Sequence, residues 1–312
     1  MQKVNDFKWK KGMTVSELVE GYTSIGFQSV EISKSADIIL KMKKSGAKTF
    51  LTFTANMVTS GLRGFFSQII KYRIPDVIVT AVGSIEEDIM KSMGEDFMLG
   101  QQKPDDIELY EKGMNRVGNL FIKNESYEKF EDKITFMLKK LYEKKKVWAV
   151  SEMIHEFGLM LNDEDSILYQ ASRNNIPIFC PAITDGALGF HLFMFQSEHP
   201  DFNVDVVKDF SNSLFSVTHD DKKGLIAVGG GVSKHYALLS CLLNGGIDYA
   251  VYITMSKSES GSLSGATTDE AKSWGKIKDD SDASTVVGEA TVVFPLIMIK
   301  VLETLENEGL LK

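Results

Sequence analysis

The sequence has few cysteines, few prolines and no long apolar run. Its two cysteines, Cys180 and Cys241, lie in apolar or helical patterns, so neither a disulfide framework nor a metal site is indicated. No apolar stretch reaches membrane-spanning length, and residues 1–11 are polar and lysine-rich, unlike a secretory leader. We therefore expect a soluble, unprocessed protein of the reducing cytoplasm, without membrane contact.

Positive charge is also scarce. The chain carries 35 lysines and arginines against 43 aspartates and glutamates, which gives a formal net charge of -8. This sign disfavours nucleic acid as a partner and is compatible with cationic ligands such as polyamines. Because 43% of the 312 residues are hydrophobic, the chain can bury a large core, and the six scattered prolines mark no domain junction. We expect one large domain over residues 1–312.

Short β-branched or aromatic runs alternate with segments of helical spacing. The expected strands are 49–54, 76–82, 176–180, 225–228, 249–254 and 285–287. The expected helices include 62–72, 127–142, 152–160, 204–215, 234–243 and 294–308. This alternation predicts an α/β fold with a parallel sheet flanked by helices on both faces. Residues 94–124 and 256–268 are expected to form long functional loops.

The sharpest local feature is an apolar strand that ends in Gly229, Gly230 and Gly231 and continues into a helical pattern. Glycines allow a pyrophosphate to approach the backbone, and the amides at a helix N-terminus favour an anion. A tight strand-to-helix turn would explain the same residues, because the run is not a strict dinucleotide fingerprint.

Three other strand ends also carry polar residues that suit a ligand. Asp185 follows the strand 176–180, where a carboxylate could bind a ribose, although an Asp-Gly turn is the simpler explanation. Asn56 and Thr59 follow the strand 49–54. The acids after Gly83 could merely favour a helix dipole. Four such strand ends in one chain nevertheless indicate a nucleotide site.

A loop of small residues leads from Ser260 to a Trp-Gly-Lys sequence. Glu270 and Trp274 are four residues apart and would share a helix face, with Lys276 projecting from the turn that follows. A partly dehydrated lysine is a better nucleophile, because losing its charge costs less. Without further context, Lys276 could equally be a surface lysine.

Taken together, several runs resemble the deoxyhypusine synthase family in order and spacing, over nearly the whole chain. They are 26–28, 85–88, 115–120, 130–132, 181–186, 229–232, 248–253 and 273–276. The resemblance implies a Rossmann-like homotetramer with NAD at dimer interfaces and a helical segment over residues 1–45. The N-terminal extension of eukaryotic members is shortened here, as in an archaeal or bacterial type.

The resemblance also implies a reaction and its residues. The family oxidises spermidine with NAD, captures the aminobutyl group as an imine on the lysine matching Lys276, and passes it to a lysine of the hypusine-bearing translation factor. The catalytic residues would be Lys276, His235, Glu270 and Trp274, with Glu86 and Tyr252 also binding substrate. NAD would contact Asn56, Thr59, Gly83, Glu87, Asp185, Gly229, Gly231, Ser256, Gly261, Ser264, Gly288 and Glu289.

The sequence departs from the family at the polyamine site. Phe190 and Leu263 stand where the family has aspartates that bind spermidine amino groups, and Ser260 replaces another acid. Because a buried ammonium needs a paired carboxylate, these changes should weaken spermidine binding or favour a shorter or less charged donor. Three alternatives stay open: transfer to a free amine as in homospermidine formation, a catalytically impaired regulatory subunit, and an ordinary NAD-dependent dehydrogenase.

Overall fold

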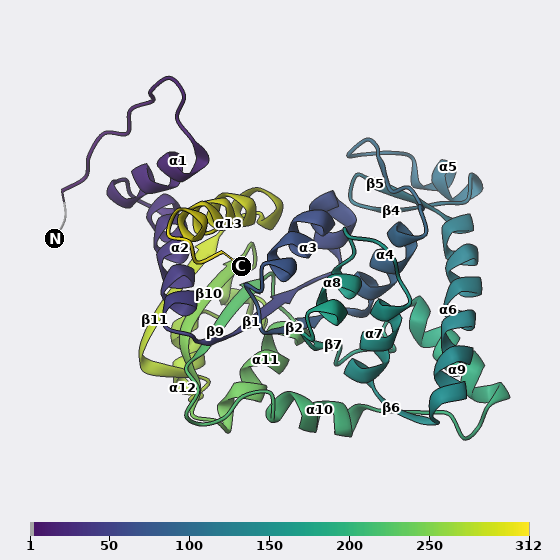
Figure 1. The fold of residues 1–312 in the computed structure, drawn as a ribbon. Coiled ribbons are helices and arrows are strands. Elements are labelled where there is room, and N and C mark those ends of the chain that lie inside the picture. Colours follow the sequence, from purple (N-terminus) through teal and green to yellow (C-terminus); the bar gives the residue numbers. More distant parts are fainter. Residues whose placement is uncertain (1–2, 312) are drawn as a thin grey trace. The chain divides into compact units, whose positions relative to one another are not determined.

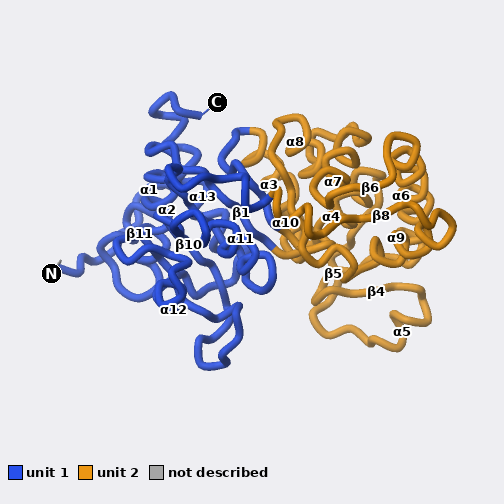
Figure 2. Tube along the Cα trace, turned by 90° about the horizontal axis from the view of Figure 1, so that it is seen from below, with its two compact units in different colours: residues 1–53, 72–79, 213–312 blue, residues 54–71, 80–212 orange. Residues whose placement is uncertain are grey.

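The computed structural model describes residues 3–311, and its residues form two compact units (Figure 2). Unit 1 comprises residues 1–53, 72–79 and 213–312, and unit 2 comprises residues 54–71 and 80–212. Each unit is described by itself below. The single domain over residues 1–312 stays a prediction.

The main sheet has six strands in the order β11-β10-β9-β1-β2-β7. Their bounds are β1 Lys48–Phe53, β2 Val77–Thr80, β7 Ile178–Phe179, β9 Lys223–Val228, β10 Ile247–Thr254 and β11 Ile277–Val287. The pairs β1–β9, β9–β10 and β10–β11 are parallel. The predicted α/β fold with a parallel sheet is therefore confirmed. The strands β1 and β9 are buried almost throughout, as expected where helices cover both faces.

Helices cover both faces of the unit 1 strands (Figure 1). The helices α2 Gln28–Lys44 and α13 Ala290–Asn307 pack on each other and on the sheet, and Ser35 of α2 bonds Ser284 of β11 at 3.1 Å. On the opposite side lie α11 Val232–Leu242 and α12 Thr268–Ser273. The strand-to-helix change predicted after Gly231 is confirmed.

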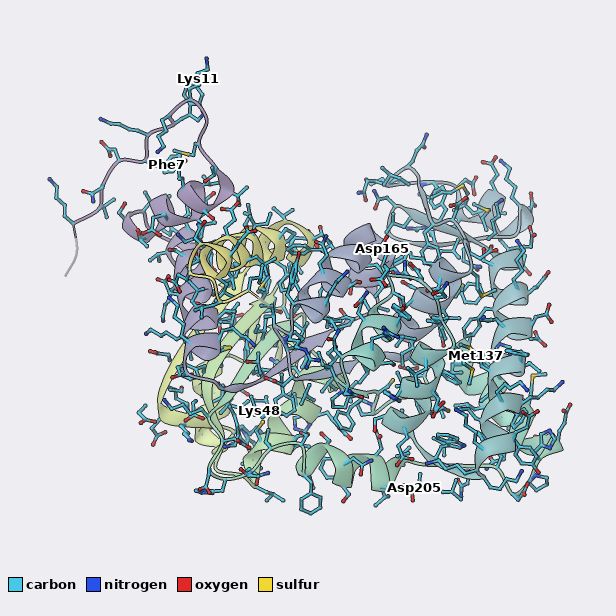
Figure 3. The ribbon with its side chains drawn as sticks, in the orientation of Figure 1. Phe7, Lys11, Lys48, Met137, Asp165 and Asp205 are labelled. Carbon is cyan, nitrogen blue, oxygen red and sulfur yellow. The ribbon has the colours of Figure 1, made fainter. Side chains whose placement is uncertain are left out.

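The N-terminal part of unit 1 is helical from residue 15. Helix α1 Val15–Gly21 starts with a capping box, in which Thr14 and Glu17 satisfy each other's backbone amides, and the 3-10 turn η1 Tyr22–Ser24 follows. The Phe7 ring, labelled in Figure 3, lies 6.3 Å from the Tyr22 ring. A Cβ at Gly21 would lie 2.7 Å from this Phe7 ring, so glycine permits the contact.

Unit 2 is mainly helical. Its elements are η2 Val58–Leu62, α3 Arg63–Lys71, α4 Val82–Ser92, α6 Asn124–Lys144, α7 Val150–Leu159, α8 Ile167–Arg173 and α9 Ala187–Glu198, with most of α10 Val206–Leu214. The strands β6 Val147–Ala149 and β8 Asn203–Asp205 form a small parallel sheet. Met137, labelled in Figure 3, belongs to the buried face of α6. None of the helices within residues 3–311 is long and apolar enough to cross a membrane.

The prediction of a long loop over residues 94–124 was wrong. This segment contains β3 Met98–Leu99, α5 Asp106–Glu111, β4 Met114–Val117 and β5 Leu120–Lys123, and its strands are antiparallel. The Gly118-Asn119 pair makes the hairpin turn, with Gly118 at a φ of 60°. The strands were missed because they are short, and β4 is mostly exposed and polar.

A buried carboxylate joins three segments of unit 2. Asp88 has no exposed surface and accepts hydrogen bonds from Arg63 Nε at 2.6 Å, Ser166 Oγ at 2.7 Å and Leu168 N at 2.8 Å. The same Arg63 guanidinium also pairs with Asp163. Asp88 thus ties α4 to the start of α3 and to the first turn of α8.

Replacing Asp88 with alanine should strongly destabilise unit 2. Arg63 would lose its most buried partner, and breaking a buried pair costs roughly 3 to 5 kcal/mol. Urea unfolding followed by circular dichroism measures the loss. Asp165→Ala is the control, because Asp165 is exposed in the same segment as Asp163 (Figure 3) and its loss should leave the midpoint unchanged. Equal midpoints for the two variants would contradict the assignment.

Candidate functional site

The carboxyl ends of the unit 1 strands meet at one edge of the sheet. Phe53 of β1 and Ile253 of β10 both pair with Val228, the last residue of β9. The glycine run follows directly, with Gly229 at a φ of 86° and Gly231 at 74°. These left-handed conformations favour glycine, and α11 starts at the next residue. The structure therefore shows a glycine-rich strand-to-helix turn, and its use as a phosphate cradle stays a prediction.

A cavity of about 40 Å³, the lysine cavity, brings together four of the predicted substrate or catalytic residues. They are Tyr252, Glu270, Trp274 and Lys276, and the other lining residues are Lys234, Leu238, Leu263, Ala266, Thr267 and Ala271. All ten belong to unit 1. Tyr252 and Lys234 lie buried at its floor, whereas Trp274 on the rim is 67% exposed. The cavity therefore has a buried floor and an open mouth.

Helix α12 and the turn after it position Lys276. Thr267 caps the helix by accepting a hydrogen bond from Glu270 N at 3.2 Å, and the helix ends at Trp274. Gly275, at a φ of 65°, reverses the chain, and Lys276 N donates to Ala271 O at 3.1 Å. The Lys276 Nζ atom then lies 5.1 Å from the centre of the Trp274 ring. This distance is within the range of a cation-π contact.

Lys234 is a charged residue of this cavity that was not among the site residues predicted from the sequence. It is 1% exposed, donates from Nζ to Ala266 O at 3.0 Å, and lies 4.5 Å from the centre of the Tyr252 ring. Burial lowers the pKa of Lys234 to about 8; Glu270 opposes this shift and Lys276 adds to it. One feature of the sequence could have indicated its burial. Lys234 precedes Leu238 by four residues, which places both on the buried face of α11.

Two other predicted residues, His235 and Tyr252, lie near these lysines, and only Tyr252 lines the cavity. His235 is half-buried and does not line the cavity. Its pKa is lowered, mainly by burial and to a smaller extent by the positive charges of Lys276 and Lys234. The Tyr252 hydroxyl is buried and has no hydrogen-bond partner within residues 3–311. A buried hydroxyl without a partner is costly, so it is a candidate contact for a water or a ligand.

In unit 2, α4 carries two further buried carboxylates directly before Asp88. Glu87 accepts hydrogen bonds from Thr59 Oγ1 at 2.6 and 2.9 Å, and burial raises its pKa to about 7. Glu86 accepts a hydrogen bond from Leu188 N at 2.7 Å, and burial also raises its pKa. Thr59 and Glu87, both predicted to contact NAD, are thus in direct contact.

The remaining predicted cofactor residues fall into two groups. In unit 2, Asn56 accepts a hydrogen bond from Thr54, Gly83 packs beside Ala55, and Asp185 is exposed. In unit 1 they follow β9, β10 and β11: Gly229, Gly231, Ser256, Gly261, Ser264, Gly288 and Glu289. Two of these are engaged locally, since Ser264 O accepts from Thr254 at 3.1 Å and Glu289 caps α13.

The two substituted positions belong to different units. Leu263 lines the lysine cavity, whereas Phe190 lies on α9 of unit 2 and is 73% exposed. Asp269 does not line the cavity and lies 3.7 Å from Lys272, so it does not replace the acid missing at Leu263. Within the cavity, two lysines therefore face a single carboxylate, Glu270. Residues 3–311 contain no group of three His, Cys, Asp or Glu side chains that could hold a metal.

Comparisons with known proteins agree on one family. The profile of the deoxyhypusine synthase family matches residues 17–301. A probable deoxyhypusine synthase of Thermoplasma acidophilum is 40% identical, covering 95% of this chain and 96% of the relative. The deoxyhypusine synthase of Neurospora crassa is 37% identical, covering 95% of this chain and 90% of the relative.

Solved structures support the same fold. A crystal structure from Entamoeba histolytica, also assigned to deoxyhypusine synthase, has a TM-score of 0.69 and 29% identity, covering 96% of this chain and 97% of the other. AgrE in complex with ornithine and NAD+ has a TM-score of 0.55 at 13% identity, covering 94% of this chain and 34% of the other. The likeness to AgrE shows the fold alone.

Glu87→Gln should change how stability depends on pH. The unfolded carboxyl loses its proton near pH 4.3, whereas folded Glu87 keeps it until about pH 7. Stability that this carboxyl contributes at low pH is therefore lost as the pH rises through this window. Between pH 5 and pH 8, the Gln variant should gain roughly 1 to 3 kcal/mol relative to wild type in urea unfolding. A parallel pH dependence of the two proteins would contradict this, and the exposed Glu111→Gln is the control.

Proposed function

This chain belongs to the deoxyhypusine synthase family and is an enzyme of that type, and we propose that it transfers an aminobutyl group from spermidine or a related polyamine to a protein lysine. The acceptor is a lysine of the hypusine-bearing translation factor. The observation that carries this proposal is the Lys276 amine, which lies 5.1 Å from the centre of the Trp274 ring in a cavity that Glu270 also lines.

Lys276, Trp274 and Glu270 of the cavity, with the nearby His235, each supply a part of this chemistry. The Lys276 nitrogen attacks the oxidised donor carbon, diaminopropane leaves, and the aminobutyl group stays on Lys276 as an imine. The acceptor lysine then displaces Lys276 from the same carbon. Trp274 stabilises the cationic imine through its ring face, by about 0.5 to 1 kcal/mol at this exposed rim. Glu270 provides the balancing carboxylate, and His235 exchanges protons at the amine.

NAD is the cofactor of this proposal, and when bound it takes up a hydride from the donor and returns it to the final imine. The glycine turn after β9 fits a dinucleotide. A Cβ at Gly230 would lie 2.5 Å from Ser264 Cα, so only a backbone without side chains fits between β9 and the loop. Gly229, Gly231, Ser264 and Ser256 would hold the phosphates in unit 1, and Asp185, Thr59 and Glu87 are the proposed contacts in unit 2. AgrE, which shares the fold, binds NAD+.

The family resemblance extends the proposal to the assembly. The protein would act in the cytoplasm as a homotetramer, with NAD and substrate at dimer interfaces. The departures at Phe190 and Leu263 favour one second candidate, a transfer to a free amine as in homospermidine formation. Its support is the single carboxylate of the lysine cavity, which leaves fewer partners for a polyamine with several charges. A catalytically impaired subunit is the outcome if no adduct forms at all.

Lys276→Arg should abolish transfer, because arginine keeps the charge but has no nucleophilic amine. Wild-type protein, NAD, labelled spermidine and the translation factor are incubated and then treated with borohydride. We expect label on Lys276 and on the translation factor in wild type, and neither in the variant. Lys272→Arg, on the adjacent helix, is the matched control and should retain both.

Each other outcome of this experiment has its own meaning. Label that appears only in free amines would support the second candidate and exclude the translation factor as acceptor. Steady NADH release that survives in Lys276→Arg would identify a simple dehydrogenase. The absence of an adduct with every polyamine would support the impaired subunit.

Leu263→Asp should improve spermidine binding, because it adds a second carboxylate to a cavity with two lysines and one acid. We expect the KM for spermidine to fall by about tenfold, which corresponds to roughly 1.4 kcal/mol, with a smaller change in kcat. Leu263→Asn is the control, because asparagine has nearly the same shape as aspartate and is polar but uncharged. An equal effect of both variants, or none, would show that charge at this position does not control donor binding.

A further inference from the structure

The lysine cavity contains a second amine, Lys234, to which none of the roles above is given. It comes from α11, whereas Lys276 follows α12, and the two lysines line the same small space. The roughly 40 Å³ of this space that is open to water is enough to hold at least one water molecule, which needs about 10 to 15 Å³. Because both amines line this space, water within it connects them as a path for a proton.

The surroundings of Lys234 hold its nitrogen in place without neutralising it. Its hydrogen bond goes to a backbone carbonyl, Ala266 O, and its other close contact is the Tyr252 ring. The charged or titratable groups around it are Glu270 from α12, Lys276 after α12, Tyr252 from β10 and His235 from its own helix. Neither of its close partners carries a negative charge.

Burial gives this lysine a pKa of about 8, so an appreciable part of it is a neutral amine near neutral pH. The neutral share grows as the pH rises through about 8 and falls below it. A group whose pKa lies near the operating pH is well suited to accept a proton in catalysis.

We propose that Lys234 is a positioning residue that acts through Lys276, by accepting the proton that Lys276 releases before it attacks the donor. An N–H bond of Lys276 breaks and an N–H bond forms on Lys234. The electron pair left on Lys276 makes the bond to the donor carbon, and total charge is unchanged. This inference rests on the proposed function, in which Lys276 is the nucleophile.

The test measures the rate of borohydride-trapped adduct formation on Lys276, with NAD and labelled spermidine, between pH 6 and pH 10. It compares wild type with Lys234→Met and Lys234→Arg in the full chain. The control is Lys223→Met, because Lys223 is also fully buried in unit 1 and bonds backbone carbonyls, Asp221 O among them, away from the cavity.

In wild type we expect the rate to rise with a midpoint near pH 8. Both Lys234 variants should lose about 100-fold at pH 7.5, the scale of one acid-base group, and recover towards pH 10. Lys223→Met should keep the wild-type profile. In Lys234→Ala, added methylamine should restore part of the rate, which a purely structural role would not allow.

Two results would overturn the inference while leaving the proposed function intact: wild-type profiles in both Lys234 variants, or full activity of Lys234→Arg, whose side chain cannot accept a proton. A wild type that forms no adduct would instead remove the proposed function itself. If Lys234→Met fails to fold by circular dichroism, Lys234→Arg, which keeps charge and length, decides the question.

Discussion

The candidate site depends on the register of four parallel strands in unit 1. Because β9 pairs with β1 on one side and β10 on the other, its end fixes where the glycine turn and α11 begin. The strand β10 in turn carries Tyr252 to the floor of the lysine cavity, and β11 anchors the turn that holds Lys276. Side chains more than 40 residues apart in sequence thus reach one small space because the strands are aligned.

Much of this arrangement could be predicted from the sequence. The apolar runs gave β1, β9 and β10 to within about two residues, and three glycines before a helical pattern marked the turn. The spacing of Glu270 and Trp274 predicted a shared helix face with Lys276 projecting from the turn beside it, and all three line the cavity. These predictions succeeded because they use local rules, in which strand period, helix period and glycine conformation depend on neighbouring residues.

The rest depends on contacts that local rules do not contain. From the sequence alone, Lys234 is expected to face solvent. Its burial follows only from the contacts of α11 with Tyr252 of β10 and with the loop that contains Ala266. Helix α9 was missed because its apolar residues lie on all sides, so no face stands out, and Phe190 and Phe193 remain exposed. The roles of the predicted cofactor residues stay predictions, and so does the tetramer.

The backbone at Lys276 is tied to the opposite end of β10 from the glycine turn. Ile247 N, at the start of β10, donates to Lys276 O at 3.0 Å, and a Cβ at the preceding Gly246 would lie 2.9 Å from Gly275 O. The Lys276 backbone therefore lies at the start of β10, whereas its side chain lines the same cavity as Tyr252, near the end of that strand. Because that backbone is fixed to β10, the length of the Lys276 side chain alone sets how far its amine can reach into the cavity.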